Sequence, residues 1–430
     1  MAHPAVVNRR NLAVVKALTY VMFAMFAMTT DSVGIIIPEV IKTFQLTLTA
    51  AGTFQYATMA GIALAALLLG QLADRLGRRQ TIIVGLTLFA AACFLFVAGD
   101  TFLFFAVLMG LSGIAIGIFK TGALALIGDI STSTAQHTTI MNTAEGFFSI
   151  GAIIGPAILV RVLGGGMSWK WLYVIAGAVC VVLIIIALVV NYPQAAKRTS
   201  GDRRRGTAGA MKNPYVLAFS LGAFLYVGVE AAIYVWMPTL LAGYQGAAAS
   251  LAAYSISVFF LLRAAGRFLG AWMLTRLRWQ TALAVSSGSI LLCFVLSVTG
   301  GVDWAVYLLP LSGIFMSVVY PTLNSKGISC VPKTEHGAAA GVILFFTCVS
   351  AVCAPMAIGA VSDAMGQITY GFWLATVLAG LLFIGLLLNW WLNPTRAMLE
   401  ALDFTEYQQG LVPEGLVVRL HGNYCSLIMS

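Results

Sequence analysis

The chain has 430 residues, of which 60% are hydrophobic and only 9% are charged, and its mean hydropathy is +0.95. Soluble domains carry roughly 25% charged residues, so this composition excludes a water-soluble globular protein, a disordered chain and a nucleic-acid-binding domain. The net charge of +9 comes from sparse side chains, which we expect to set the orientation of the chain in a membrane.

Twelve apolar segments follow one another along the chain. Each is long enough to cross a bilayer, which takes about 20 apolar residues in an α-helix. We therefore predict an all-α membrane protein in a lipid bilayer and number the segments as spans 1 to 12. They lie at residues 16–39, 50–72, 81–99, 102–128, 139–162, 171–191, 214–241, 249–273, 281–299, 305–326, 337–361 and 370–393.

Lys and Arg residues are distributed unevenly between the two sides that these spans define. Most of the 24 lie on the side of the N-terminus, whereas the loops of the opposite side carry only Lys42, Arg161 and Lys170. Because cytoplasmic loops carry the excess of positive charge, we expect a multi-pass protein of the inner cell membrane with both termini in the cytoplasm.

One hydrophilic segment, at residues 191–213, interrupts the chain near its middle. It is polar and basic, as expected of a cytoplasmic linker. The linker separates a predicted N-terminal six-helix bundle at 1–190 from a C-terminal six-helix bundle at 214–393. Residues 394–430 form a predicted cytoplasmic tail, to which no role is assigned.

The two halves match each other at a shift of 200 residues. Pro38 aligns with Pro238, and the sequence Leu-Ser-Gly-Ile occurs at 111–114 and again at 311–314. The order of such matches along the spans indicates that six helices are duplicated. Two parallel six-helix repeats that enclose a site at the bilayer midplane are typical of a secondary transporter, in which the repeats rock about the site.

The loop after span 2 carries a specific motif. Residues 70–79 read Gly-Gln-Leu-Ala-Asp-Arg-Leu-Gly-Arg-Arg, which resembles the signature loop of the major facilitator superfamily. The resemblance implies the major facilitator fold, with a gate of Asp74, Arg75 and Arg78 that latches the cytoplasmic side when the site faces outward. Leu274 replaces the acidic residue in the second half, so only the first half is expected to carry a complete latch.

A narrower resemblance, to the fucose permease branch of proton-coupled sugar symporters, rests on three patches. They are Asn-Thr-Ala-Glu-Gly-Phe at 142–147, Tyr-Val-Gly-Val-Glu at 226–230 and Gly-Arg-Phe-Leu-Gly at 266–270. The chain departs from the branch where the span-1 aspartate would fall near Gly34 and the span-4 glutamate near Lys120. The coupling residues of the branch therefore do not transfer directly to this chain.

Ionisable side chains within a bilayer are costly and therefore mark function. Asp31 in span 1 is the leading candidate for the proton carrier, with a static hydrogen-bonded acid as the alternative. Lys120 in span 4 is predicted to pair with Asp31 and to bind a substrate acceptor such as a carboxylate once Asp31 is protonated; the alternative is a structural ion pair. Glu145 in span 5 could bind sugar hydroxyls, carry the proton or simply contact cytoplasmic water, and the resemblance to the fucose permease branch implies a substrate-binding amide at Asn142, one turn earlier.

Span 7 carries a stripe of aromatic and acidic residues. Tyr226, Glu230 and Tyr234 are spaced four residues apart on one helix face, and Trp236 follows. Aromatic rings stack on the apolar face of a sugar while a carboxylate accepts hydrogen bonds from its hydroxyls, so these residues are predicted to bind substrate, and Glu230 is a second candidate for proton coupling. The alternative is a packing stripe with one satisfied acid.

Spans 8 and 10 supply the remaining candidates. Arg263 lies deep in span 8 and is predicted to face the substrate or Glu230. Arg267 lies nearer the cytoplasm and is predicted to gate. Tyr320 and Asn324 in span 10 are expected to line the site.

These features predict a secondary active transporter and not an enzyme: a proton symporter that moves a small hydrophilic solute, a sugar or a sugar acid, by alternating access. The alternative is a proton-coupled exporter of drugs or other amphipathic compounds, because residues 151–156 resemble half of the antiporter motif. A facilitator or sensor without proton coupling is a third interpretation. We expect a monomer whose partners are the solute and protons. The seven cysteines have unpaired spacings, so no disulfide, metal ion or cofactor is expected.

Overall fold

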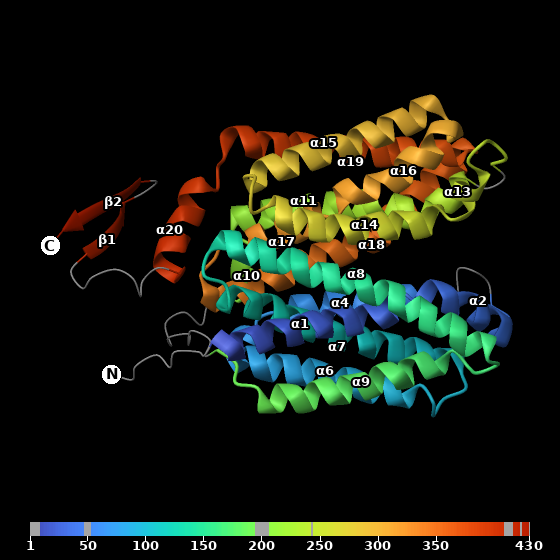
Figure 1. Ribbon diagram of the computed structural model, residues 1–430, viewed down its shortest axis with the longest axis horizontal. Helices are drawn as coiled ribbons and strands as arrows, with labels where there is room; N and C mark the ends of the chain where they lie inside the picture. Colours follow the sequence, from blue (N-terminus) through green and yellow to red (C-terminus); the bar gives the residue numbers. More distant parts are fainter. Residues whose placement is uncertain are drawn as a thin grey trace.

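The computed structural model describes residues 9–46, 53–193, 206–241, 244–407, 416–421 and 424–429. The basic part of the predicted linker, at 197–205, lies outside the described residues, as does the predicted start of span 2, at 50–52. The helices run side by side along the long axis of the molecule, with the first half of the chain in one layer and the second half in the other (Figure 1).

The first half is entirely helical within the described ranges. Its short helix α5 belongs to the loop after span 2, and its long helices form spans 1 to 6. In chain order they are α1 (Arg9–Thr30), α2 (Val33–Phe44), α4 (Thr53–Leu69), α5 (Leu72–Leu76), α6 (Arg78–Leu95), α7 (Phe102–Asp129), α8 (Thr134–Gly164) and α9 (Lys170–Val189).

The second half repeats this arrangement and adds a tail. Its helices are α10 (Thr207–Ala210), α11 (Pro214–Ala231), the π-helical turn η2 (Ala232–Trp236), α12 (Met237–Leu240), α13 (Ala249–Ala253), α14 (Ser255–Met273), α15 (Trp279–Gly300), α16 (Val302–Met316), α17 (Val319–Ile328), the 3₁₀ turn η3 (Lys333–Glu335), α18 (His336–Met365) and α19 (Ile368–Leu392). The tail contains α20 (Arg396–Tyr407) and an antiparallel hairpin of β1 (Leu416–His421) and β2 (Tyr424–Met429).

The twelve predicted spans are confirmed. Within the described residues, 11 helical segments are long and apolar enough to cross a membrane, and α4 is a shorter apolar helix of 17 residues in the place of span 2. Large apolar side chains such as Trp391 and Leu392 remain exposed, as expected of a surface that faces lipid. Span 8 is shorter than predicted, because its helix is interrupted at Tyr254.

Breaks in the helices occur at equivalent places in the two halves. Span 1 is interrupted between α1 and α2 at residues 31–32, and span 7 passes through the π-helical turn η2, which begins at Ala232, 200 residues after Ser32, and ends just before Pro238. Span 10 breaks at residues 317–318, where the ring of Pro321 would crowd the carbonyl of residue 317. Discontinuous helices at the centre of a repeat fold are typical of binding sites in transporters.

Each half has its own apolar core. In the first half, the ring centroid of Phe26 lies 4.7 Å from that of Phe89 and 4.3 Å from that of Phe119. In the second half, Phe294 lies 6.4 Å from Phe372. The core of the first half also takes in apolar residues of α11, α17 and α18, so the interface between the halves carries apolar contacts as well as polar residues.

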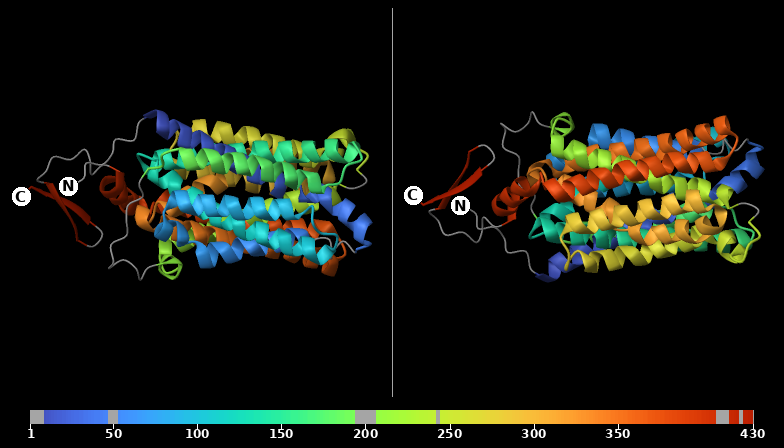
Figure 2. Two further views of the ribbon diagram at one scale, coloured as in Figure 1. Left: turned by 90° about the horizontal axis from the view of Figure 1, so that it is seen from below. Right: turned by 90° about the horizontal axis from the view of Figure 1, so that it is seen from above.

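The two ends of the bundle differ. The start of α1, together with α10 and α20, lies at one end, which we call the linker end (Figures 1 and 2). Helices α2 and α13 lie at the opposite end, which we call the far end.

Candidate functional site

Asp74 and Arg78 form hydrogen bonds between the two halves at the linker end. Gly77, between α5 and α6, has a φ of +93°, a conformation that favours glycine, and this turn places Arg78 on the first turn of α6. Arg78 donates to Asp74 Oδ1 at 2.7 Å, to Asp129 Oδ2 at 2.8 Å and to the main-chain oxygen of Lys333 at 2.5 Å. The last of these bonds crosses from the first half to the second.

Asp74 reaches the second half through the main chain of α18. Its carboxylate oxygens accept hydrogen bonds from the N–H groups of Gly337 at 3.1 Å and Ala338 at 3.0 Å. These N–H groups stand in the first turn of α18, where they have no partner in their own helix and where the helix dipole favours a negative charge. Burial raises the pKa of Asp74 above its ordinary value, against the opposing effects of Arg78 and the two N–H groups.

Arg75, the third predicted residue of the latch, does not cross between the halves in this conformation. Its side chain is exposed and donates to Gln71 Oε1 of the same half at 3.0 Å. Of the three residues that the signature loop suggested, Asp74 and Arg78 therefore make the contacts between the halves.

Helices α4 and α18 also approach each other closely at the linker end. A Cβ atom at Gly341 would lie 2.3 Å from the main-chain oxygen of Ala66 and 3.0 Å from the Cα of Gly70. Because the obstructing atoms belong to the main chain, a larger residue at 341 would force the halves apart.

Hydrogen bonds between α8 and α17 continue this contact towards the centre of the molecule. Thr138 Oγ1 lies 2.9 Å from Ser325 Oγ, and His137 Nδ1 lies 2.9 Å from Ser329 Oγ. All four side chains are buried. Separation of the halves at the linker end would have to break these bonds as well.

The tail helix α20 joins the same contact, a role that was not assigned to it from the sequence. Asp403 accepts hydrogen bonds from the main-chain N–H of Thr134 at 2.7 Å and from its hydroxyl at 3.0 Å, at the start of α8. Glu406 accepts from the N–H of Lys333 at 3.5 Å. The sequence carried one indication of this role, which is that the tail has acidic residues whereas the other loops on the same side are mainly basic.

Arg267 and Glu145 form an ion pair between the halves. Arg267 Nη1 of α14 lies 2.5 Å from Glu145 Oε2 of α8 and also donates to the main-chain oxygen of Glu145 at 2.9 Å. The two side chains are 1% and 5% exposed, so this pair is shielded from water. The pair thereby extends the contact between the halves that closes the linker end. Glu145 is thus buried and is not an acid in contact with water.

Glu230 is held within the second half. Arg263 Nη2 lies 2.9 Å from Glu230 Oε1, and the Tyr226 hydroxyl donates to the same oxygen at 2.7 Å. The ring of Tyr226 stacks on that of Tyr320 at 6.2 Å between centroids. Tyr226 of the span-7 stripe therefore holds the Glu230 carboxylate in position. Arg263 faces Glu230, which is one of the two orientations predicted for it, the other being towards the substrate.

Asp31 and Lys120 are two charged groups at the centre that are not fully buried. Asp31 stands at the break in span 1, is exposed, and accepts a hydrogen bond from the Thr30 hydroxyl at 2.9 Å. It interacts electrostatically with Lys120 and Arg263, which come from different halves, so it faces the space between them. Lys120 is half-buried and lies over the ring of Phe148, 4.7 Å from its centroid. A direct Asp31–Lys120 ion pair is not formed within the described part of the chain.

The other predicted binding residues surround this centre. Tyr234 interacts electrostatically with Asp31 and Glu230. Trp236 Nε1 donates to the main-chain oxygen of Pro355 at 3.1 Å, which fixes its ring within the second half. Two buried amides have a side-chain oxygen that accepts no hydrogen bond from any described residue: those of Asn142 and Asn324.

The site is closed on one side. Among the described residues, the hydrogen bonds and ion pairs that join the two halves lie between the Glu145–Arg267 pair and the linker end. Asp31 is nevertheless exposed. Access to the centre in this conformation is therefore from the far end.

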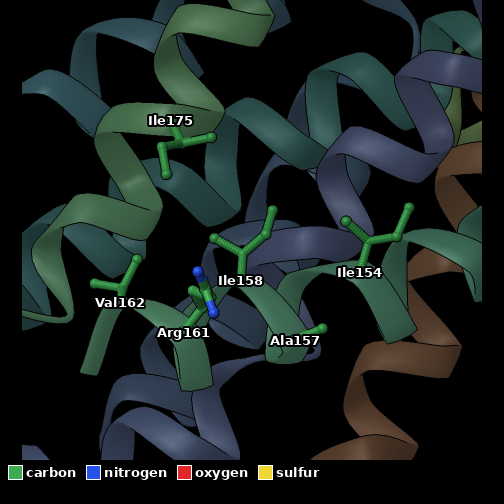
Figure 3. A pocket seen from close by; sticks show the side chains of 6 residues that line it. All are labelled: Ile154, Ala157, Ile158, Arg161, Val162 and Ile175. Atoms are coloured by element: carbon green, nitrogen blue, oxygen red, sulfur yellow. The ribbon is translucent and has the colours of Figure 1, made fainter. Parts of the chain in front are cut away.

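A separate groove of about 470 Å³ lies between α8 and α9. It is lined by apolar side chains and one arginine: Ile154, Ala157, Ile158, Arg161, Val162 and Ile175 (Figure 3). None of the charged residues of the centre takes part in it, so it is not the candidate site. Within the described ranges no group of three His, Cys, Asp or Glu residues could hold a metal ion.

Known proteins share both the sequence and the fold. The chain is 24% identical over 387 residues to a glucose/galactose transporter of Brucella abortus, covering 85% of this chain and 91% of that protein. It is 25% identical over 402 residues to the L-fucose-proton symporter of Escherichia coli, covering 84% and 89%. The crystal structure of the transporter FucP in the outward conformation superposes with a TM-score of 0.74 at 22% identity, covering 88% of this chain and 99% of that one.

Two repeats of six helices around a charged centre define a multi-pass membrane transporter of the alternating-access kind. The sequence profile of the Major Facilitator Superfamily matches residues 19–355, and the chain belongs to that family. The resemblance in the signature loop is thereby confirmed, as is the prediction of a transporter and not an enzyme. The fold, with its twelve spans in two repeats, is also that of the proton:xylose symporter XylE, at a TM-score of 0.74 and 14% identity.

Proposed function

We propose that the protein is a proton-coupled symporter that brings a sugar or a sugar acid across the inner cell membrane. The observation that carries the proposal is the charged centre, where exposed Asp31 lies beside two ion pairs, Glu145–Arg267 and Glu230–Arg263. The names of the similar proteins, a glucose/galactose transporter and an L-fucose-proton symporter, support the same substrate class.

Asp31 is proposed to carry the proton. It is the accessible carboxylate of the centre, whereas Glu145 and Glu230 are each engaged by an arginine. A proton on Asp31 removes one negative charge beside Lys120 and Arg263, so protonation changes how the centre binds the solute. Glu145 and Glu230 remain the other candidates for coupling.

The solute is proposed to bind between the two halves. Tyr226, Tyr234, Trp236 and Tyr320 offer ring faces and hydroxyls, and Asn142 and Asn324 have amide oxygens without partners. A small hydrophilic molecule needs such a mixture of stacking and hydrogen-bonding groups. The exporter of amphipathic compounds is less well supported, because six charged side chains suit a polar solute.

Reorientation requires that the linker end opens. The contacts of Asp74 and Arg78 with α18 and η3, and the Glu145–Arg267 pair, are proposed as the gate that must part. Each contact crosses between the halves, so a rocking motion breaks all of them together. Arg75 is exposed in the same loop, so it is free to contact the second half in another conformation.

The linker end is proposed to lie in the cytoplasm, with both termini, the linker and the tail. Its loops carry the excess of Lys and Arg residues, which cytoplasmic loops do. The conformation described above would then face outward. The bundles at 1–190 and 214–393 are proposed as the two rocking units of a monomer.

A proton gradient is sufficient for this task. For a neutral sugar, one proton moving through a potential of 100 mV supplies about 2.3 kcal/mol. At about 1.4 kcal/mol for each factor of ten, this energy supports roughly forty-fold accumulation of solute. For a monoanionic acid carried with one proton, the pH gradient is the driving force.

The test is the external pH of lightly buffered, de-energised cells that express the protein. Hexoses, deoxyhexoses, amino sugars and sugar acids are added one at a time. Alkalinisation with one class of solute, absent in Asp31→Asn and retained in Asp363→Asn, would support the proposal; Asp363 is an exposed aspartate near the end of α18. Equal alkalinisation in Asp31→Asn would refute the role of that residue.

A further inference from the structure

Lys120 differs from the other two cations at the centre of the molecule. In the described part of the chain, six charged side chains meet there: Asp31, Glu145, Glu230, Lys120, Arg263 and Arg267. Arg263 and Arg267 each contact a carboxylate oxygen, at 2.9 and 2.5 Å. Lys120 forms no ion pair with any of the described residues, and its ammonium group lies against the ring of Phe148.

The position of Lys120 is that of a binding group. Its side chain is half-buried, so water and a solute can reach it. It interacts electrostatically with Asp31 and Glu145 of its own half and with Cys348 on α18 of the other half. The ammonium group therefore stands between the two halves, where the solute is proposed to bind.

The charges at the centre balance only while all three acids are ionised, because three carboxylates then face three cations. The neighbouring side chains that could also titrate are phenols and a thiol, which add no charge at neutral pH: Tyr226, Tyr234, Tyr320 and Cys348. A proton on Asp31 leaves one positive charge in excess. An uncompensated charge in a low-dielectric interior is unfavourable.

We propose that Lys120 binds a carboxylate of the solute, and that the solute is a monoanionic sugar acid carried together with one proton on Asp31. This inference rests on the proposed symport function and specifies its substrate class. Protonation of Asp31 removes the competing negative charge near Lys120, and the bound anion restores the charge balance of the closed centre. The ring of Phe148 holds the ammonium group in place until the anion arrives.

Electroneutral transport is the direct consequence. One proton and one monoanion together move no net charge, so a pH gradient drives uptake and an imposed membrane potential does not. A neutral sugar carried with a proton would move one positive charge, and its uptake would respond to the potential.

The experiment uses the full-length protein in proteoliposomes. D-galacturonate and D-glucuronate are compared with the neutral parents D-galactose and D-glucose, under a pH gradient and under a potassium-diffusion potential set with valinomycin. We expect the acids to be taken up under the pH gradient, with no response to the potential. Lys120→Gln should lower this uptake at least tenfold, and Lys120→Arg should retain part of it. Lys42→Gln, which changes an exposed lysine on α2, is the matched control.

The results separate this inference from the function on which it rests. Proton-dependent, potential-driven uptake of only the neutral sugars would overturn the inference and leave the symporter intact. Uptake of the acids that Lys120→Gln leaves unchanged would overturn the role of Lys120. If no member of either set is taken up in response to a proton gradient, the proposed function fails and the inference fails with it.

Discussion

Replacement of Asp74 by alanine should open the linker end. Asp74 is the acceptor for the N–H groups of Gly337 and Ala338 across the interface. A buried donor that loses its acceptor costs about 1–3 kcal/mol, so two such groups destabilise the closed end by at least ~2 kcal/mol. Water can satisfy both groups once the halves separate, so the cost falls on the closed state alone. At about 1.4 kcal/mol for each factor of ten, the open-to-closed ratio should rise roughly thirtyfold.

The labelling rate of a buried cysteine measures this ratio. Ser325 is fully buried where α8 meets α17, and Ser325→Cys changes a single side-chain atom. The protein, with its exposed Cys353 replaced by serine, is placed in nanodiscs and treated with a maleimide that cannot enter the bilayer. The same protein with Ser325 intact gives the background rate. We expect Asp74→Ala to accelerate the labelling of residue 325 roughly thirtyfold.

Arg75→Gln provides the control for this experiment. Arg75 belongs to the same loop and carries charge, but within the described part of the chain its side chain bonds only to Gln71 of its own half. Its replacement should leave the labelling rate unchanged. An unchanged rate in Asp74→Ala, or an equal acceleration in Arg75→Gln, would refute the reasoning that the latch acts through the N-terminus of α18.

Three further predictions use the same cysteine. Asp403→Asn weakens the bonds of α20 to α8 by about 1 kcal/mol, the difference between a charged and a neutral acceptor, and should accelerate labelling about fivefold. Glu400→Gln, which loses a surface pair, should leave the rate unchanged, and equal effects of the two changes would contradict a role for the tail. Gly341→Val should raise the rate roughly fivefold or more, at about 1–3 kcal/mol for overpacking against main chain, whereas Gly385→Val, which meets open space, should have no effect. Because the pKa of Asp74 is raised in the closed state, that state binds a proton more tightly than the open one. The labelling rate of residue 325, divided by that of an exposed cysteine at the same pH to remove the effect of thiol protonation, should therefore fall as the pH drops through the raised pKa of Asp74. An equal fall of this ratio in Asp74→Ala would show that another group is responsible.

The spans could be predicted because apolar length alone decides which segments cross a bilayer. The interruptions within them were harder to place. A proline explains the break in span 10, since Pro321 acts on the carbonyl of residue 317. The break at Asp31 has no such marker, and it gives that carboxylate its exposure.

The charged residues of the centre could be found in the sequence, but their partners could not. The predicted Asp31–Lys120 pair is not formed, whereas Glu145 is bound by Arg267 from the other half. Helical spacing says which residues share a face of one helix, and it does not say which face of another helix they meet. Pairing across the two halves depends on the rocking position of the bundles, which changes during the transport cycle.

The latch shows most clearly why part of the site escapes sequence reasoning. Asp74 and Arg78 belong to a recognisable motif, yet their partners in the second half are main-chain groups of Gly337, Ala338 and Lys333. Main-chain donors and acceptors are present at every residue, so no residue type marks them. The second half needs only to let the loop that carries Asp74 come close to the main chain of α18. Small residues at the start of α18, such as Gly337 and Ala338, allow this approach. The two halves therefore contribute differently to the latch. The first half carries the charged motif, which the sequence reveals. The second half carries the N-terminus of a helix, which stays accessible with any short side chains and so leaves no mark in the sequence.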